Sequence, residues 1–526
     1  MNTLYLGDCL NVLRDNVPDE SVDLIYNDPP FNSKRDYNIF FDDKEIQTQR
    51  IAFEDTWTLK NIQDSLAELH TLKTDYLYFL LLTYQKVAPH AFPYLTMMSL
   101  RILEMHRVLK PTGSFYLHCD PTMSHYLKTA CDIIFGEKNY RNEISWKRSN
   151  PKSHTTNNIP NCRDIIFRYT KSDDFTFNKV FQPLEDDYVE KAYRYVDDSG
   201  RKYRLLPLLN PNDNRPNLTY EFLGVKRVWR WTRERMQKAY EEGLVVQLKE
   251  GSVPQYKKYL DESEGRTITN DWNDIDQASG NESLGYPTQK PKALLERIIK
   301  ASSNEGDTVL DGFSGCGTTV DAAEGLHRNW IGIDISPIAI SLVKRRLLDT
   351  YGEHLSKFEV RGTPTDEQSA IELWKQNPNA FQDWWLTEFE VFSTTFGTKG
   401  ADKGIDGIAQ YLTDPKTQNV IRVAFQVKGG VHIQSKDIDA LLGAMDKHKC
   451  ELGVFLTIAE PTKPMLDTIA SSGFIEIPGF KIPRLQILTL EDYFKKKLLK
   501  LPKYNITFKA AHLKGKKKQN QIKLDI

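Results

Sequence analysis

The chain has 526 residues, with 70 Lys and Arg against 71 Asp and Glu, 40% hydrophobic residues and 27% charged residues. This composition is typical of a globular protein and excludes a fibrous or largely disordered chain. The net charge of -1 excludes attraction of the whole molecule to DNA or to an anionic membrane, so a nucleic-acid surface must arise from local clustering. At roughly 100 to 200 residues per domain, we expect about three domains.

The N-terminal segment and the cysteines indicate the compartment. The first ten residues lack the basic start and the apolar core of a signal peptide, and the most apolar run, 77–82, is too short to cross a bilayer. The six cysteines show no paired short spacing, so neither a disulfide framework nor a zinc site is indicated. We therefore expect a cytoplasmic protein with free thiols and no membrane contact.

The first part of the chain, 1–145, alternates helices with buried strands. Strands are predicted at 3–6, 22–26 and 114–118, with a helix after the first and an amphipathic helix before the last. The loop 27–33 follows the second strand. This alternation predicts an α/β fold.

The pattern changes over 146–285 to short strand-like pieces and charged turns, and then resumes in 286–360. The resumed part reads as helix 291–301, strand 308–311, a Gly-rich loop, helix 318–325 and strand 329–334. The simplest interpretation is one sheet interrupted by an insert.

The remainder of the chain divides into three segments. A polar stretch at 361–374 is predicted to be a linker, and 375–500 is predicted to be a second α/β unit. The basic tail, 501–526, is interpreted as a solvated end, with a nucleic-acid arm as the alternative.

The Gly-rich loop indicates a ligand site. Asp311 ends the strand, and Gly312, Gly315 and Gly317 lie in the turn into the next helix, which lets the backbone approach a ligand closely. Two of the glycines have P-loop spacing, but Thr318 occupies the position of the phosphate-binding Lys, which disfavours ATP hydrolysis.

Asp334 ends the following strand, about twenty residues after the glycines, where a carboxylate can accept hydrogen bonds from ribose hydroxyls. A nucleoside cofactor fits this pattern. A dinucleotide or a purely structural turn stays open on these residues alone.

The segment AsnAspProProPhe, 27–31, suggests the chemistry. An exocyclic aromatic amine is a poor nucleophile until acceptors draw its hydrogens out of the ring plane. Asp28 can accept one hydrogen, Pro29 and Pro30 can orient a backbone carbonyl toward the other, and Phe31 offers a stacking face for an extruded base. The alternative is an ordinary polar turn with two prolines.

Together, 27–31 and 311–317 resemble the paired signatures of amino-group DNA methyltransferases that use S-adenosylmethionine, over roughly residues 1–350. The order of the two motifs resembles the permuted β class. The resemblance implies a Rossmann-like methyltransferase sheet with a target-recognition insert, acting on double-stranded DNA by base flipping.

The resemblance also implies roles for single residues. The catalytic loop would be Asp28, Pro29, Pro30 and Phe31. The cofactor would be bound by Asp311, Phe313, Gly315, Gly317 and Asp334, with Thr288 and Lys290 near its carboxylate and Asp8 near its adenine.

One departure is Gly312, where the family more often has Pro. The acidic first residue of the ProPro loop resembles adenine-N6 enzymes, and cytosine-N4 enzymes remain the alternative. In the insert, Arg227, Trp229, Arg230, Trp231 and Arg233 suit base and phosphate contacts, or alternatively a surface above core tryptophans.

A second constellation lies in the C-terminal unit. Odd positions of 421–428 are apolar, while Gln426 and Lys428 share the opposite face of a strand. A preceding strand and a turn at 414–419 form a hairpin that brings Asp406 beside them. A carboxylate and a carboxamide oxygen can bind a divalent cation, and a Lys can stabilise charge on a phosphate.

This pattern resembles the restriction-endonuclease-like fold of Mrr-type nucleases, over about 375–480, with Gln in place of the usual acidic strand residue. It implies Asp406, Gln426 and Lys428 as cutting residues, with Mg2+ on Asp406 and Gln426 and a further ligand from Glu388 or Glu390. A domain that only binds DNA is the alternative, and a homodimer is also left open.

Overall fold

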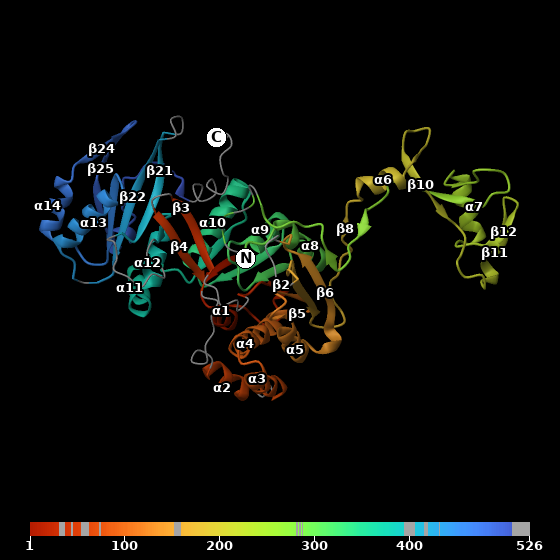
Figure 1. Cartoon of the computed structure of the whole chain (residues 1–526), viewed down its shortest axis with the longest axis horizontal. Helices are drawn as coiled ribbons and strands as arrows, with labels where there is room; N and C mark the ends of the chain where they lie inside the picture. The colour runs from red at the N-terminus through yellow and green to blue at the C-terminus, as the bar shows by residue number, and fades with distance from the viewer. Residues whose placement is uncertain are drawn as a thin grey trace. The chain divides into compact units, whose positions relative to one another are not determined.

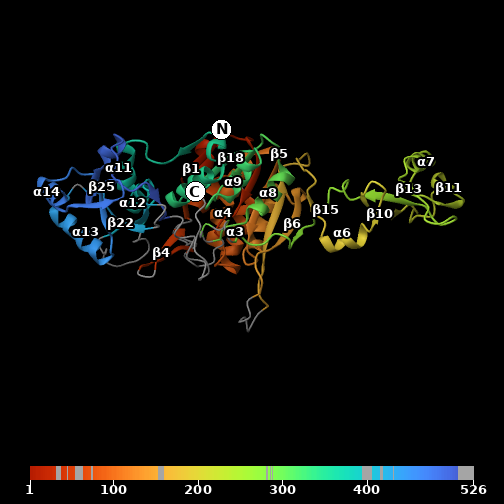
Figure 2. The same ribbon diagram turned by 90° about the horizontal axis from the view of Figure 1, so that it is seen from above.

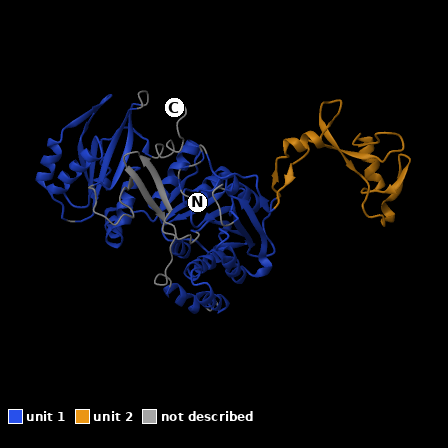
Figure 3. Ribbon diagram, in the orientation of Figure 1, with its two compact units in different colours: residues 1–178, 270–526 blue, residues 179–269 orange. Residues whose placement is uncertain are grey.

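The computed structural model divides the chain into two compact units, Met1–Asn178 with Asn270–Ile526, and Lys179–Thr269 (Figure 3). The residues that it describes are 1–30, 37–43, 46–53, 63–72, 75–151, 159–279, 282, 284, 286, 288–393, 405–414, 419–430 and 432–507. Each unit is described by itself.

The first unit contains a nine-stranded sheet in the order β16-β6-β7-β5-β2-β17-β18-β1-β19. Its strands are β1 (Asn2–Leu6), β2 (Val22–Asn27), β5 (Leu109–Cys119), β6 (Tyr140–Lys147), β7 (Arg163–Thr170), β16 (Asp271–Trp272), β17 (Thr308–Asp311), β18 (Asn329–Asp334) and β19 (Phe358–Arg361). The run from β5 to β19 is parallel, whereas β7 is antiparallel to both of its neighbours. The predicted α/β Rossmann-like sheet is confirmed.

Strands β2 and β17 mark the point where the strand order reverses. The chain leaves β2 toward β5 on one side, and it leaves β17 toward β18 on the other. Ligands of open α/β sheets bind at the carboxyl ends of such a strand pair. This topology places the loop after β2 beside the loop after β17.

Helices cover both faces of this sheet (Figure 1). One group consists of α1 (Cys9–Asn16), α2 (Gln63–Thr71), α3 (Asp75–Val87), α4 (Phe92–Val108) and α5 (Ser124–Phe135), and the other of α8 (Lys292–Ser302), α9 (Thr318–Gly325) and α10 (Pro337–Tyr351). Helix α4 is buried nearly all round because it packs on the sheet and on α1, α3 and α5. A hairpin of β3 (Tyr37–Asp43) and β4 (Ile46–Phe53) lies between β2 and α2 in the chain.

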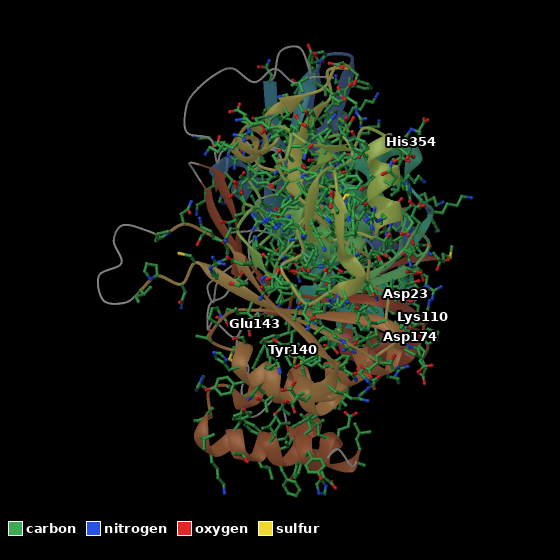
Figure 4. The ribbon with its side chains drawn as sticks, turned by 90° about the vertical axis from the view of Figure 1, so that its right-hand side faces the viewer. Asp23, Lys110, Tyr140, Glu143, Asp174 and His354 are labelled. Atoms are coloured by element: carbon green, nitrogen blue, oxygen red, sulfur yellow. The ribbon has the colours of Figure 1, made fainter. Side chains whose placement is uncertain are left out.

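Asp23, near the start of β2, contacts both of the strands that neighbour β2 in the sheet. Its carboxylate lies 2.8 Å from the Nζ atom of Lys110 in β5 and accepts a hydrogen bond of 2.9 Å from the backbone N–H of Thr308 in β17. Figure 4 shows Asp23 and Lys110 side by side. These contacts fix the stagger of β2 and β17, and therefore the alignment of their carboxyl ends.

The C-terminal part of the first unit has its own six-stranded sheet. Its strands are β20 (Phe392–Ser393), β21 (Gly407–Asp414), β22 (Asn419–Lys428), β23 (Leu452–Thr457), β26 (Leu485–Thr489) and β27 (Tyr504–Asn505). The helices α11 (Glu367–Gln376) and α12 (Pro378–Thr387) pack on one face, and α13 (Ser435–Lys447) and α14 (Lys463–Ser471) on the other (Figure 2). A hairpin of β24 (Phe474–Ile477) and β25 (Phe480–Pro483) and the helix α15 (Leu490–Phe494) complete it.

Two segment boundaries differ from the predicted ones. The stretch predicted as a linker, 361–374, contains the start of α11, because Asp366 caps this helix by accepting a hydrogen bond of 2.8 Å from the N–H of Ser369. The segment predicted as tail begins with β27, which pairs with β21. Residues 508–526 lie outside the described part of the chain.

The second unit, within the predicted insert, has short elements. They are β8 (Phe181–Gln182), α6 (Asp186–Ala192), β9 (Tyr195–Val196), β10 (Lys202–Pro207), β11 (Thr219–Phe222), β12 (Val225–Val228), α7 (Arg233–Glu241), β13 (Val245–Val246), β14 (Gln255–Tyr259) and β15 (Arg266–Thr267). Its core centres on Trp229, which is fully buried and donates its indole N–H to the carbonyl of Tyr220. Trp229 is therefore a core tryptophan, whereas Arg227, Arg230 and Arg233 are exposed.

Among the described residues, no helix combines the length and the apolar character needed to cross a membrane.

Candidate functional site

The loop after β2 holds polar atoms that are buried without hydrogen-bond partners. Asn27 is fully buried, and within the described residues neither atom of its amide group has a partner. The Oδ1 atom of Asp28 is also buried and unpaired there, and Pro29 beside it is buried. Unpaired buried polar atoms are costly, so a bound ligand that supplies partners would stabilise this loop. Phe31 lies outside the described residues.

The glycine turn after β17 packs directly against this loop. A Cβ atom at Gly312 would lie 3.0 Å from the Oδ1 atom of Asn27 and 2.9 Å from the Sγ atom of Cys9. A Cβ atom would also lie 2.8 Å from the Cε atom of Met105, so a larger residue at this position needs these side chains to shift. Glycine, which departs from the family pattern, fits the position without such a shift.

The turn continues with two glycines in the left-handed region, Gly315 with φ +50° and Gly317 with φ +76°. The carboxylate of Asp334 holds the turn, because its Oδ2 atom accepts a hydrogen bond of 2.8 Å from the N–H of Gly315 and its Oδ1 atom accepts one of 2.8 Å from Ser336. Phe313 is partly buried against the apolar core. Asp334 thus holds the turn in its conformation. Its predicted contact with a ribose would be a second role.

Carboxylates gather at this edge of the sheet. Burial raises the pKa of Asp311 to about 7, and repulsion from Asp28 and Asp334 adds to the effect. Burial also raises the pKa of Asp334 to about 6. A cationic ligand would relieve this concentration of negative charge, and an anionic one would not.

Lys290 occupies an unexpected place. Its side chain is only 7% exposed, and its ammonium donates to the Oδ2 atom of Asp28 at 2.5 Å and to the backbone carbonyl of Thr288 at 3.4 Å. Thr288 is exposed and has a φ of +62°, which is strained for a β-branched residue. The structure therefore brings Lys290 to the predicted catalytic loop.

Asp8 caps helix α1 by accepting hydrogen bonds from the N–H groups of Leu10 and Asn11, and it pairs with Arg101. It lies close to Asp334 along the sheet edge, because the N–H of Gly7 donates to the carbonyl of Asp334 at 2.9 Å. Asp8 thus belongs to the same edge as the other predicted cofactor residues.

Sequence reasoning missed a buried chain of side chains behind the loop. The hydroxyl of Tyr26 lies 2.8 Å from the Nδ1 atom of His118, whose Nε2 atom lies 3.1 Å from the Oδ2 atom of Asp164. Burial raises the pKa of Asp164, but the bond and charge of His118, with the charges of Lys290 and Arg148, outweigh it and hold that pKa below its ordinary value. No local pattern could reveal this chain, because its members come from three separate strands.

Tyr286 was also missed as a site residue. It is buried, and a Cβ atom at Gly315 would lie 3.2 Å from its ring. Tyr286 precedes the predicted site residues Thr288 and Lys290 in the same short segment before α8. This closeness in the sequence was the signal that could have identified it.

The C-terminal site is only partly assembled in the described residues. Asp406 immediately precedes β21. Its backbone N–H donates a hydrogen bond of 2.8 Å to the carbonyl of Phe425, and its Oδ2 atom accepts one of 2.6 Å from the N–H of Val427, so it contacts the residues on both sides of Gln426 in β22. The Oε1 atom of Gln426 is buried without a hydrogen-bond partner among those residues. Lys428 follows on the same face of the strand and is half-buried.

The two further acids are engaged elsewhere. Glu388 accepts a hydrogen bond of 2.8 Å from the hydroxyl of Tyr493, and Glu390 lies 2.9 Å from Arg345. Over the described ranges, which omit 394–404, no group of three or more His, Cys, Asp or Glu side chains could hold a metal ion.

Comparison with known proteins adds to this picture. A family described as DNA methylase matches residues 22–345, and one described as restriction endonuclease matches residues 385–477. A solved structure of the M1.HpyAVI-SAM complex is 17% identical, with a TM-score of 0.31, and covers 66% of this chain and 99% of that one.

Two curated relatives are longer than the matched region. The chain is 32% identical over 259 residues to the type II methyltransferase M.EcaI of Enterobacter cloacae, covering 48% of this chain and 57% of that protein. It is 28% identical over 347 residues to the Mod subunit of the type III restriction-modification enzyme StyLTI of Salmonella typhimurium, covering 62% of this chain and 50% of that protein. The chain thus spans about half the length of these relatives.

A third relative is the DNA adenine methyltransferase YhdJ of Escherichia coli, 25% identical over 346 residues that cover 66% of this chain and 82% of that protein. The match of the first family extends from β2 to α10 and so includes both loops of the site. The chain belongs to the DNA methylase family and carries a restriction endonuclease domain at its C-terminal end.

Proposed function

We propose that the chain transfers a methyl group from S-adenosylmethionine to the N6 amino group of adenine in double-stranded DNA. The observation that carries this proposal is the Oδ1 atom of Asp28, a buried acceptor without a hydrogen-bond partner in the described residues, beside the glycine turn at the reversal point of the sheet. Family membership supports the reaction class.

The residues at this edge fit the donor. S-adenosylmethionine carries a sulfonium, and the three carboxylates Asp28, Asp311 and Asp334 form a site in which a cation is favoured. Its ribose would be held by Asp334, its adenine would lie near Asp8, and its methionine portion near Phe313 and the glycine turn. When bound, it supplies an electrophilic methyl group.

The side chains of the loop would activate the amine. Asp28 accepts one amino hydrogen at Oδ1, and the backbone held by Pro29 and Pro30 accepts the other. The nitrogen lone pair would then point out of the ring plane and attack the methyl carbon. The N–C bond would form as the bond between the methyl group and the sulfonium sulfur breaks, S-adenosylhomocysteine would leave, and the nitrogen would lose one proton along its hydrogen bond to Asp28. Positioning of the amine and the methyl group in this way lowers the activation barrier, and the transfer needs no metal.

Adenine is favoured over cytosine by the acidic residue that opens the ProPro loop. The relative YhdJ is named as an adenine enzyme, which agrees with this choice. The cytosine N4 atom is the alternative target, because it is also an exocyclic amine.

We propose that the second unit reads the DNA sequence. Residues 201–240 carry an excess of Lys and Arg, and several of these side chains are exposed, including Arg227, Arg230 and Arg233. Exposed guanidinium groups can contact phosphates and base edges. Association of two copies of the chain and a cytoplasmic location stay predictions.

For the C-terminal domain, we propose Mg2+-dependent DNA cleavage. The observation that favours it is the buried Oε1 atom of Gln426, which has no hydrogen-bond partner among the described residues and lies between Phe425 and Val427, both hydrogen-bonded to Asp406. Asp406 and Gln426 would hold the ion, which would activate water, and Lys428 would stabilise charge on the phosphate. Binding of DNA without cleavage is the alternative.

Expression in a bacterial host that lacks DNA methylation tests the methyltransferase proposal. Host DNA is hydrolysed and the methylated nucleosides are identified, for the chain itself and for Asp28→Ala. We expect N6-methyladenine with the first and none with the second, while calorimetry shows that the variant still binds S-adenosylmethionine. N4-methylcytosine would correct the base, and absence of both marks with soluble protein would refute the proposal.

A further inference from the structure

The ammonium of Lys290 lies in the charged cluster behind the catalytic loop. It donates to Asp28 at Oδ2, and its positive charge also helps to lower the pKa of Asp164. Asp164 is fully buried, and it is linked through His118 to Tyr26, two residues before Asp28 in the chain. Lys290 therefore compensates negative charge both at Asp28, directly after β2, and at Asp164 in β7, two strands that β5 separates in the sheet.

The backbone around Lys290 is held firmly. Gln289 is buried, its Nε2 atom donates to the carbonyl of Glu282 at 2.7 Å, and its Oε1 atom accepts from the N–H of Leu284 at 2.7 Å. Helix α8 begins two residues after Lys290, at Lys292, whose N–H donates to the carboxylate of Glu282 at 2.5 Å. These bonds fix the segment on both sides, so the Lys290 side chain extends toward Asp28 from a defined place.

The contact with Lys290 makes the two oxygens of the Asp28 carboxylate different from each other. One oxygen, Oδ2, accepts from Lys290, while the other, Oδ1, is buried without a partner in the described part of the chain. An ammonium on one oxygen restricts rotation of the carboxylate. The other oxygen is then presented in one orientation to an incoming N–H donor.

We propose that Lys290 is a positioning residue for Asp28, and that it acts on the target amine through this carboxylate. The inference rests on the proposed methyl transfer and departs from the expectation that Lys290 binds the carboxylate of the donor. Because the Lys290 side chain is 7% exposed and its ammonium already donates to Asp28, loss of the ammonium affects the methyl-transfer step rather than donor affinity.

The decisive variants are Lys290→Met, which keeps length and removes charge, and Lys290→Arg, which keeps charge. Lys300→Met is the matched control, since Lys300 is a more exposed lysine on α8 that pairs with Glu296. We expect Lys290→Met to lower kcat about 100-fold, the size of effect that misplacement of a reacting group produces. The Kd of S-adenosylmethionine, measured by calorimetry, should stay within about threefold, less than the factor of ten that 1.4 kcal/mol produces. Lys290→Arg should restore much of kcat, and Lys300→Met should change neither quantity.

A cycle with Asp28→Asn supplies a readout that needs no activity. Asp28→Asn leaves the buried ammonium without its carboxylate and should lower Tm, and Lys290→Met added to it should recover part of the loss. Purely additive changes in Tm would show that the two side chains do not act together, and would overturn the proposal.

The experiments also distinguish failure of the Lys290 proposal from failure of the proposed function. A rise of about tenfold or more in the Kd of the donor for Lys290→Met, with kcat retained at saturating donor, would assign Lys290 to the donor carboxylate and overturn the proposal. If the unaltered chain transfers no methyl group to DNA, the proposed function fails. In that case the Tm cycle still decides whether Lys290 and Asp28 act as a pair.

Discussion

The backbone N–H of Gly315 donates a hydrogen bond of 2.8 Å to the Oδ2 atom of Asp334, nineteen residues later in the chain. The bond joins the turn after β17 to the end of β18, the neighbouring parallel strand. Asp334 therefore shapes the turn before any ligand is present. The same carboxylate retains lone pairs for the hydroxyls of a ribose.

Asp334→Asn should weaken the binding of S-adenosylmethionine. An amide keeps one oxygen, which can accept from Gly315 but not also from Ser336, and it carries no charge for a cationic donor. We therefore expect Kd to rise about tenfold, which corresponds to 1.4 kcal/mol. With the pKa of Asp334 at about 6, the carboxylate ionises as pH rises from 5 to 7, and Kd for the unaltered chain should fall over that range. Calorimetry at pH 5, 6 and 7 measures both effects. Asp349→Asn on α10 is the control, and an equal pH dependence in Asp334→Asn would contradict the prediction.

Asp311 should make stability depend on pH. Its pKa in the folded chain, about 7, lies above the ordinary value of 3.8, so the folded state favours the protonated form. The stabilisation is fully present below pH 3.8 and is lost as pH rises through 7, by up to about 4 kcal/mol. Hydrogen exchange of β17 and α9 at pH 5 and pH 8 measures this loss locally.

The matched variant for that prediction is Asp311→Asn, which keeps an oxygen to accept from the N–H of Phe313 and cannot ionise. It should protect β17 better than the unaltered chain does, by a larger margin at pH 8 than at pH 5, because the loss in the unaltered chain grows as pH rises from 3.8 to 7. Protection that falls in parallel for both proteins would show that Asp311 is not the titrating group.

The sequence predicted local elements around the donor turn well. The predicted strand 308–311, helix 318–325 and strand 329–334 coincide with β17, α9 and β18, because short apolar runs there are bounded by Gly, Asp and Asn. The pairing of Lys290 with Asp28 spans 262 residues and depends on which strands become neighbours, so no local pattern could predict it. The same holds for His118, whose partners lie on other strands.

The boundary between the two domains shows a second limit of prediction from the sequence. Residues 361–374 are polar and look like a linker, yet the Asp366 cap starts helix α11 within them. The polar composition indicates solvent exposure there, whereas the helix depends on two reciprocal capping bonds between Asp366 and Ser369 and on packing against α12.

Gly317→Ala should destabilise the methylase fold more than its backbone conformation alone explains. A Cβ atom there would lie 2.6 Å from the Cγ2 atom of Val343, in addition to the left-handed φ of +76°. Gly306 has φ +83° and nothing within 4 Å of a Cβ atom, so Gly306→Ala measures the backbone cost alone, about 1 kcal/mol. We expect Gly317→Ala to cost about 1 to 3 kcal/mol more in urea unfolding, because the added methyl overpacks the contact.

Partial recovery in Gly317→Ala with Val343→Ala would confirm the source of that cost. Equal losses for Gly306→Ala and Gly317→Ala would show instead that the turn and α10 can move apart without a penalty.

Gln426→Glu should make the C-terminal domain respond more strongly to Mg2+. Gln426 is 5% exposed, and its Oε1 atom has no hydrogen-bond partner in the described residues, so a glutamate would add a second buried carboxylate near Asp406. Without a divalent ion, two buried carboxylates repel each other, and Tm should fall. With Mg2+, the second carboxylate becomes a stronger ligand than the amide, so Tm should recover and nicking of plasmid DNA should increase. Asp406→Asn in the same background removes the other ligand and should abolish both the recovery and the nicking. A loss of Tm in Gln426→Glu that Mg2+ leaves unchanged would mean that this pair does not bind the ion, and would favour a domain that binds DNA without cutting it.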